Sequence, residues 1–176
     1  ITFTNKADKE MKDRLSLLID GNIRDMQIST FHSFGLKIIK ENYKFFKLNS
    51  TFTILDDTDS ISLVKKIMKD MNLDEKMYNP KSVRYKISSA KNELLTPEAY
   101  SIYSNTKIDE EVVKIYKKYQ EKLLQNNSVD FDDLLMLPIQ LFKNNKEALE
   151  YYQNKYKYVF IDEYQDTNEA QYLLSK

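Results

Sequence analysis

The spacing of hydrophobic positions changes along the chain and divides it into parts. Two short apolar runs, ITFT (1–4) and MQIST (26–30), each precede a segment whose hydrophobic residues recur every three or four positions. Short runs of β-branched and aromatic residues are typical of strands, and the longer spacing is typical of one face of a helix. The beginning of the chain therefore predicts strand, helix, strand, helix, an order that a parallel sheet with covering helices requires.

The two predicted helices of this part have recognisable boundaries. Asn5 is the expected cap of the first helix and Gly21 its expected end. The second helix is predicted over residues 31–46. The apolar positions expected to face the interior are Ala7, Met11, Leu15 and Leu18 in the first helix, and Phe31, Phe34, Ile38 and Ile39 in the second.

From about Phe52, after a short FTIL, the pattern predicts helices without strands. Asp56 or Asp57 is expected to cap the first of them. Pro80 and Pro97 are expected in the first turns of two more, because each proline follows a capping residue. Apolar residues at helical spacing are Ile61, Val64, Ile67, Met68 and Met71 in the first helix, and Ile108, Val112, Ile115, Tyr119 and Leu123 in a longer one.

The end of the chain combines helices with a further strand. Pro138 is expected to kink or break a helix, because proline lacks a backbone donor. The run YVFI (158–161) predicts a short buried strand, and NEAQYLLSK begins another helix. We therefore expect a fold that is mostly α with an α/β part, in which a partial parallel sheet carries a large all-helical insertion. The α/β part is placed at residues 1–41 and 155–176, and the insertion at 42–154.

Composition limits the kinds of partner. The 27 basic and 27 acidic side chains balance, so any contact with nucleic acid must be local. The absence of cysteine excludes disulfides and thiolate metal sites, and no apolar run is long enough to cross a bilayer. These features predict a cytoplasmic protein without membrane contact. Ile1 stands where an initiator methionine would, and EAQYLLSK stops within a helical pattern, so the chain is also expected to be a fragment.

The segment YVFIDEYQDTN (158–168) carries the strongest chemical signal. Its apolar run ends in two adjacent carboxylates, Asp162 and Glu163, which a parallel strand would place at the edge where open α/β sheets bind nucleotides. Asp162, with Glu163 beside it, could hold Mg²⁺ on nucleotide phosphates. Glu163 could activate the attacking water, and Gln165 could sense the γ-phosphate. An isolated apolar run followed by Asp-Glu, however, more often only ends a strand and caps a helix.

The full string is more specific than the pair of carboxylates. DEYQDTNEAQ resembles motif II, the Walker B segment, of the UvrD/PcrA/Rep group of superfamily-one DNA helicases. TFTNKADKEMKDR (2–14) resembles motif Ia of that family, and STFHSFGLKII (29–39) resembles its motif Ib. FTILDDTD, AKNELLTPEAY and VDFDDLL resemble further segments in the same order, so the resemblance spans nearly the whole chain.

The resemblance implies ATP-driven translocation along single-stranded DNA in the 3′ to 5′ direction. It implies ATP and Mg²⁺ as cofactors, and single-stranded DNA, a duplex junction and repair or replication proteins as partners. It also implies a first RecA-like domain with an inserted helical subdomain. The family's GxxxxGK[ST] phosphate loop does not occur in these residues and is expected upstream of Ile1, so the fragment alone is expected to be inactive.

The resemblance further implies DNA contacts. The candidates are Phe3, Thr4, Asn5 and Lys6 in motif Ia, and Thr30, His32 and Ser33 in motif Ib. Phe3 could stack on a base, and the polar side chains could bind phosphate. Taken without the motif, Phe3 is more often sheet core, Asn5 a helix cap and His32 a packed or surface residue.

The insertion offers a second set of candidates. Basic residues surround Tyr85, namely Lys81, Arg84, Lys86 and Lys91. Among them, Arg84, Tyr85 and Lys86 are the predicted contacts to DNA, although a run of charges is usually a solvated helix face. Three nearby carboxylates could suggest a metal site, but helix capping and charge complementarity with the helix dipole in the first turn explain them more simply: Asp130, Asp132 and Asp133.

Two alternatives to a UvrD-like helicase stay open. One is the helicase part of an AddA- or RecB-like helicase-nuclease, against which Tyr164 counts because those relatives more often carry phenylalanine there. The other is a non-catalytic module whose inserted helices dock proteins or bind DNA passively. This second alternative predicts that Glu163→Gln leaves the function intact.

Overall fold

The computed structural model describes residues 1–19, 23 and 26–176. Its elements, in chain order, are α1 (Asn5–Leu18), α2 (Phe31–Glu41), β1 (Thr53–Leu55), α3 (Asp57–Asp70), α4 (Pro80–Asn92), α5 (Pro97–Ser101), α6 (Lys107–Gln125), β2 (Ser128–Asp130), α7 (Asp133–Asn144), α8 (Lys146–Lys155), the short 3₁₀ helix η2 (Tyr164–Asp166) and α9 (Glu169–Ser175). The chain is mostly helical, as predicted, with a small parallel sheet.

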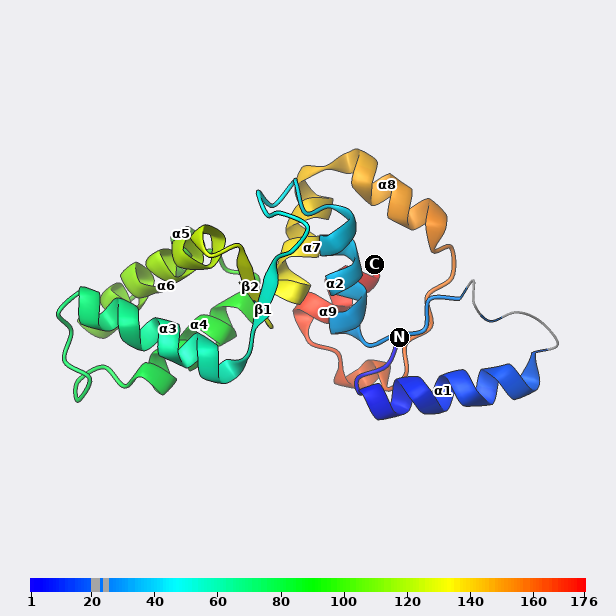
Figure 1. Ribbon diagram of the computed structural model, residues 1–176, viewed down its shortest axis with the longest axis horizontal. Coiled ribbons are helices and arrows are strands. Elements are labelled where there is room, and N and C mark those ends of the chain that lie inside the picture. Colours follow the sequence, from blue (N-terminus) through cyan, green and yellow to red (C-terminus); the bar gives the residue numbers. More distant parts are fainter. Residues whose placement is uncertain (20–22, 24–25) are drawn as a thin grey trace.

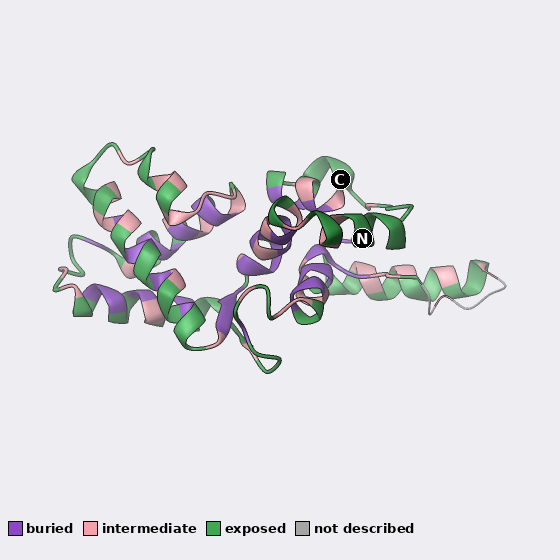
Figure 2. Cartoon of the chain, turned by 90° about the horizontal axis from the view of Figure 1, so that it is seen from above, coloured by how far each residue is buried: buried purple, intermediate pink, exposed green. Residues whose placement is uncertain are grey.

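The helices form two lobes, with the two strands between them (Figure 1). We call α3, α4, α5 and α6 the helical lobe, and α2, α7, α8 and α9 the basal lobe. Strands β1 and β2 pair in parallel, with Thr53 opposite Ser128 and Leu55 opposite Asp130. Helix α1 extends away from both lobes and stays largely exposed (Figures 1 and 2).

Each lobe has its own hydrophobic core. The core of the helical lobe is made by Val64, Ile67, Met68, Val83, Ile87, Val112, Ile115, Tyr116, Tyr119 and Leu123, among others. The core of the basal lobe is made by Phe31, Phe34, Ile38, Leu135, Ile139, Leu141, Tyr152, Ala170 and Leu174. Helices α7 and α8 thus pack with α2 and α9, although they lie within the segment predicted to be inserted.

Local signals predicted the helix starts of the middle of the chain. The Asp56 side chain accepts a hydrogen bond from the backbone of α3 at 2.8 Å, and α4 and α5 begin at Pro80 and Pro97. The predicted apolar face of α6 is buried except for Ile108, which is 41% exposed in the first turn. These predictions are confirmed because caps and first-turn prolines act within a few residues.

The first helix differs from the prediction in its cap and its burial. Thr4, not Asn5, caps α1: its hydroxyl accepts a hydrogen bond from the Ala7 amide at 3.1 Å. Of the predicted inner face of α1, Leu18 is 80% exposed, whereas Ala7, Met11 and Leu15 are half-buried, so this face is only partly covered. The predicted end at Gly21 lies outside the described residues.

The predicted strands are only partly present. Within the described residues, the segment 26–30 pairs with the start of the chain only through a parallel bridge between Thr2 and Thr30. Residues 158–161 form no strand, and Tyr158 and Phe160 are 84% and 82% exposed. Conversely, β2 lies in a segment predicted to lack strands. A parallel strand needs a partner far away in sequence, so a local pattern of three residues does not reveal it.

Helix α7 runs through Pro138 without a break, so of the kink or break predicted there the break is absent. Because Pro138 has no amide hydrogen, the Leu134 carbonyl lacks its usual helical partner. Gly35 of α2 lies against this carbonyl: a Cβ added to Gly35 would lie 1.8 Å from the Leu134 oxygen. The missing side chain of Gly35 therefore lets α2 and α7 approach closely at this point.

Replacing Gly35 with alanine is expected to lower the free energy of unfolding by about 1–3 kcal/mol, because the new methyl group must push α2 and α7 apart. Urea denaturation followed by circular dichroism measures the change. Lys40→Ala, at an exposed position of the same helix, is the control and is expected to change stability by less than about 0.5 kcal/mol. Equal stability of the two variants would contradict the close contact.

In the described residues, no helix combines the length and the apolar character that a bilayer crossing needs.

Candidate functional site

Three extended segments run in parallel next to one another. Thr2 forms a parallel bridge with Thr30 on one side. On the other side, the amino group of Ile1 donates to the Phe160 carbonyl at 2.6 Å, and the Asp162 amide donates to the Ile1 carbonyl at 3.0 Å. In a parallel pair, one residue donates to a residue of the neighbouring segment and accepts from the residue two positions further on, as Ile1 does here. The segments 158–161, 1–3 and 27–30 therefore end at the same edge.

This edge brings together the residues predicted to bind nucleotide and those predicted to bind DNA. Asp162 and Glu163 follow the first segment, Thr4 and Asn5 follow the second, and Thr30 to Ser33 follow the third. The second and third segments lead directly into α1 and α2. Open α/β sheets bind ligands at the carboxyl ends of their strands, so this edge is the candidate functional site.

The candidate catalytic side chains lie exposed in a tight turn at this edge. Asp162 and Glu163 immediately precede η2. Glu163 has a left-handed backbone, with φ 51° and ψ 45°, which costs a residue other than glycine roughly 1–2 kcal/mol. The Gln165 side-chain amide donates to the Glu163 carboxylate, so the two side chains lie together. Such strained backbone positions cluster at functional sites.

The donor set at this edge fits a magnesium ion that arrives with a nucleotide. Among the described residues, no group of three or more histidine or acidic side chains gathers closely enough to hold a metal alone. Mg²⁺ usually keeps several waters and binds through one or two carboxylates together with phosphate oxygens. Asp162 and Glu163 supply such carboxylates.

The motif Ia residues divide between core and surface. Phe3 is half-buried and packs edge to face on Phe31, with ring centroids 5.6 Å apart, so it belongs largely to the core of the basal lobe. Thr4 caps α1, and Asn5 and Lys6 are exposed in its first turn. The free amides of a helix N-terminus favour anions, which suits these three residues to a phosphate.

The motif Ib residues form the start of α2. The Thr30 hydroxyl accepts from the Ser33 amide at 3.2 Å and donates to the Ser33 hydroxyl at 3.0 Å. His32 stacks on Phe131 of the β2–α7 turn, with ring centroids 4.0 Å apart. Burial lowers the pKa of His32, although the nearby Asp132 charge acts in the opposite direction. His32 is therefore neutral at neutral pH.

The basic stretch of the insertion does not form a positive surface. Arg84 and Lys91 have side chains that are only 7% and 0% exposed, so they are not available to DNA. The Lys86 ammonium pairs with Asp109 at 2.6 Å. Of the predicted contacts on α4, Tyr85 is 75% exposed and Lys86, although paired, keeps 41% of its side chain exposed, so these two remain open to a partner.

Arg84 and Lys91 instead belong to a buried ion cluster at the junction of α4 with β2 and α7. Lys91 donates to Asp130 at 2.8 Å and to Asp133 at 2.9 Å, and Arg84 donates to Asp132 at 2.8 Å. These ion pairs involve all three aspartates, for which helix capping and first-turn charge complementarity were predicted. Asp133 does lie in the first turn of α7, and Asp130 accepts a hydrogen bond from the Asp133 amide at 2.9 Å, while the Asp132 side chain makes no capping bond.

The ion cluster perturbs the titration of its members. Burial and the charge of Asp130 raise the pKa of Asp133 to about 6. Burial acts against the charged form of Lys91, but Asp130 and Asp133 outweigh it, so the pKa of Lys91 lies above its ordinary value. The cluster thus holds a charged lysine in the interior only as long as both carboxylates surround it.

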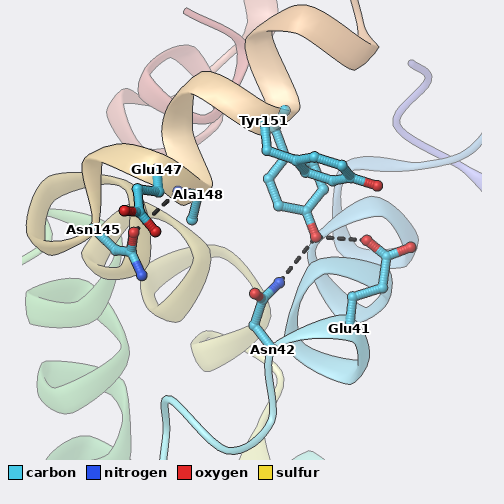
Figure 3. Close-up of a pocket in the computed structure, with 7 residues that line it drawn as sticks. Glu41, Asn42, Asn145, Glu147, Ala148 and Tyr151 are labelled. Carbon is cyan, nitrogen blue, oxygen red and sulfur yellow. Dashed lines mark hydrogen bonds between the residues drawn. The ribbon is translucent and has the colours of Figure 1, made fainter.

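Two surface hollows are alternative candidates for the functional site. The larger, of about 570 Å³, lies between the end of α2 and α8 and is lined by Glu41, Asn42, Asn145, Glu147, Ala148, Tyr151 and Tyr152 (Figure 3). Its two carboxylates disfavour phosphate, and its lining includes none of the predicted site residues. The smaller, of about 430 Å³, is lined by Val159, Phe160, Ile161, Tyr164, Tyr172, Ser175 and Lys176 and adjoins the candidate edge.

The larger hollow is held in shape by hydrogen bonds of its own. The Tyr152 hydroxyl accepts from the Asn42 side chain at 2.9 Å and donates to the Glu41 carboxylate (Figure 3). These bonds fasten α8 to the end of α2. They give the hollow a structural role, so we place the functional site at the edge.

Comparison with known proteins agrees with the motifs at this edge. All of the chain, residues 1–176, matches the UvrD/REP helicase N-terminal domain. The chain belongs to this family. It is 48% identical over 176 residues to the ATP-dependent DNA helicase PcrA of Bacillus subtilis and 45% identical to that of Staphylococcus epidermidis, covering 100% of this chain and 24% of each relative. It is 41% identical over 175 residues to that of Leuconostoc citreum, covering 99% of this chain and 23% of the relative.

Membership of the UvrD/REP family confirms the predicted resemblance to the UvrD/PcrA/Rep group. The chain spans about a quarter of the length of these relatives. The motifs did not single out Phe131, which lies 52% exposed against His32. The sequence offered one signal for Phe131. It is an aromatic residue between two acidic ones in VDFDDLL, at a position where an apolar side chain cannot cap a helix.

Proposed function

We propose that the chain is part of the N-terminal domain of an ATP-dependent DNA helicase that couples ATP hydrolysis to 3′ to 5′ movement along single-stranded DNA. The observation that carries this proposal is the shared edge of three parallel segments, where Asp162 and Glu163 lie beside the starts of α1 and α2. The relatives named above are ATP-dependent DNA helicases, which supports the same conclusion.

In this proposal, the turn after residue 161 serves ATP and Mg²⁺. Asp162 would hold the ion together with phosphate oxygens, and the bound ion supplies neutralisation of the phosphate charge. Glu163 would accept a proton from the attacking water at a carboxylate oxygen. Gln165 already bonds to the Glu163 carboxylate and would orient it toward the water while contacting the γ-phosphate.

Single-stranded DNA would lie along the starts of α1 and α2. The exposed polar side chains there, Thr4, Asn5, Lys6 and Ser33, together with the helix N-termini, suit backbone phosphates. The stacked pair of His32 and Phe131 offers an exposed aromatic face to a base. Tyr85 on α4 is the proposed contact to the duplex junction.

We propose that residues 1–41 and 155–176 belong to a RecA-like part and that the inserted subdomain lies within 42–154. The hydrophobic cores of the two lobes support an insertion shorter than 42–154. Helices α7 and α8 share a core with α2 and α9, whereas the helical lobe has a core of its own. The compact inserted unit is therefore proposed to be 53–130.

The 176 residues alone are expected not to hydrolyse ATP, because they contain no GxxxxGK[ST] loop to hold the phosphates. Phosphate release, measured with and without single-stranded DNA, tests this expectation. Substantial DNA-stimulated turnover by the 176 residues would refute it.

Binding of single-stranded DNA is expected to strengthen as the pH falls from about 7 to about 5.5, the range in which histidine titrates. In the free protein, burial lowers the pKa of His32. A phosphate beside the ring would favour the imidazolium form and raise that pKa, so the complex binds more protons than the free protein and gains affinity at lower pH. Fluorescence anisotropy at constant ionic strength measures the effect, and His32→Asn is expected to remove it. The same pH dependence in both proteins would count against His32 as a contact.

The polarity of unwinding tests the proposed function in the longer protein of which, we propose, this chain is a part. With ATP and Mg²⁺, a duplex carrying a 3′ single-stranded tail is expected to be separated, whereas one with a 5′ tail is not. Unwinding from the 5′ tail alone, or from neither substrate, would contradict the proposal.

A further inference from the structure

We infer that Asn92, the last residue of α4, is a positioning residue that couples DNA binding at the β2–α7 turn to the ATP site through its hydrogen bond to Asn168. The inference rests on the proposed function and names a route by which DNA regulates the same site. Asn92 touches neither of the proposed ligands, so it would act only through its neighbours.

The side-chain amide of Asn92 bridges three elements. Its Oδ1 accepts from Asn168 Nδ2 at 3.3 Å. Its Nδ2 donates to the Ser88 carbonyl at 2.9 Å and to the Asp132 carboxylate at 3.3 Å. Because Asp132 and the Ser88 carbonyl can only accept, the amide is fixed with its oxygen toward Asn168. Among the hydrogen bonds of the described residues, the bond between Asn168 and Asn92 joins the helical lobe directly to the segment 158–168.

On the DNA side, Asp132 is held in place and lies next to the proposed contact. Arg84 donates to Asp132 at 2.8 Å, and the Ser88 hydroxyl donates to it at 3.0 Å. Asp132 directly follows Phe131, whose ring stacks on His32. A base or phosphate that moves this aromatic pair therefore moves the carboxylate to which Asn92 is bonded.

On the ATP side, Asn168 caps α9 and ends the turn that begins at Glu163. The Asn168 Oδ1 accepts from the backbone amide of Gln171 at 2.9 Å, and the backbone amide of Asn168 donates to the Gln171 Oε1 at 3.1 Å. Only the 3₁₀ helix η2 and Thr167 separate Asn168 from Glu163. Since α9 is packed into the core of the basal lobe, a displacement of Asn168 is taken up by the short turn that holds the catalytic carboxylate.

Asn92→Ala in the longer protein tests the coupling. We expect the stimulation of ATP turnover by saturating single-stranded DNA to fall roughly fivefold, while turnover without DNA and the Kd for DNA stay within roughly twofold of the unmodified protein. Asn144→Ala is the matched control, because Asn144 is also the last residue of its helix and its Nδ2 also donates to the carbonyl four residues earlier, at 2.8 Å. The control is expected to keep full stimulation.

A double-mutant cycle separates coupling from a general loss of structure. Asn168→Asp keeps an acceptor for the helix cap but removes the donor to Asn92. If the two residues act through their bond, the double variant loses no more stimulation than Asn92→Ala alone. Additive losses, or equal stimulation in Asn92→Ala and Asn144→Ala, would overturn the inference. If the unmodified protein shows no DNA-stimulated turnover, the proposed function itself fails, which is a different outcome.

Discussion

Replacing Glu163 with glutamine in the longer protein is expected to lower kcat for ATP hydrolysis by about 10²- to 10⁴-fold, because the amide cannot accept the proton of the attacking water. ATP binding is expected to persist, since glutamine has nearly the same shape and Asp162 remains in place. Steady-state turnover and binding of a fluorescent ATP analogue measure the two quantities separately.

Asp166→Asn is the matched control for this substitution. Asp166 is an exposed carboxylate of the same turn and has no proposed role in hydrolysis. The Asp166→Asn variant is expected to keep kcat within about threefold of the unmodified protein, a change much smaller than the loss of a general base would cause. Full turnover by Glu163→Gln would instead favour the non-catalytic docking module.

Replacing Lys91 with methionine is expected to lower the free energy of unfolding by about 3–5 kcal/mol, because it leaves buried carboxylates without their partner. Lys91 has no exposed side-chain surface and bonds to Asp130 at 2.8 Å and Asp133 at 2.9 Å. Lys86→Met on the same helix is the control. Its pair with Asp109 is partly exposed, so the expected loss is below about 1 kcal/mol.

The loss in Lys91→Met is also expected to depend on pH. Burial already raises the pKa of Asp133 to about 6, and without Lys91 the carboxylates gain a further preference for the protonated form. A carboxyl group whose pKa is raised by folding binds protons more tightly in the folded state, so it stabilises the fold as the pH falls. Urea denaturation should therefore show a smaller deficit at about pH 5 than at about pH 8, a window set by this raised pKa. An equal deficit at both values would contradict the burial of unpaired charge.

The sequence predicted features that depend on neighbours within a few residues. Pro80 and Pro97 mark helix starts because a proline after a capping residue favours a first turn in almost any context. The burial of Phe31 and Ile38 followed from helical spacing alone. The membership of the family followed from short strings of residues that need no knowledge of the fold.

The features that were missed depend on residues that are distant in sequence. Lys91 was predicted at the surface, because nothing near it in the chain reveals Asp130, 39 positions away. Of the kink or break predicted at Pro138, the break is absent, and the contact of α7 with Gly35 of α2 lies far outside any local window. The bond between Asn92 and Asn168 joins residues 76 positions apart, so only the fold brings them together.

One edge of this domain is proposed to serve both ATP and DNA. The most direct test is the rate of ATP hydrolysis by the longer protein, with Mg²⁺ present, as single-stranded DNA is added. We expect turnover to rise at least about tenfold and to saturate with DNA, an effect within the range of coupling between two sites. Turnover that stays the same with and without DNA would contradict the claim.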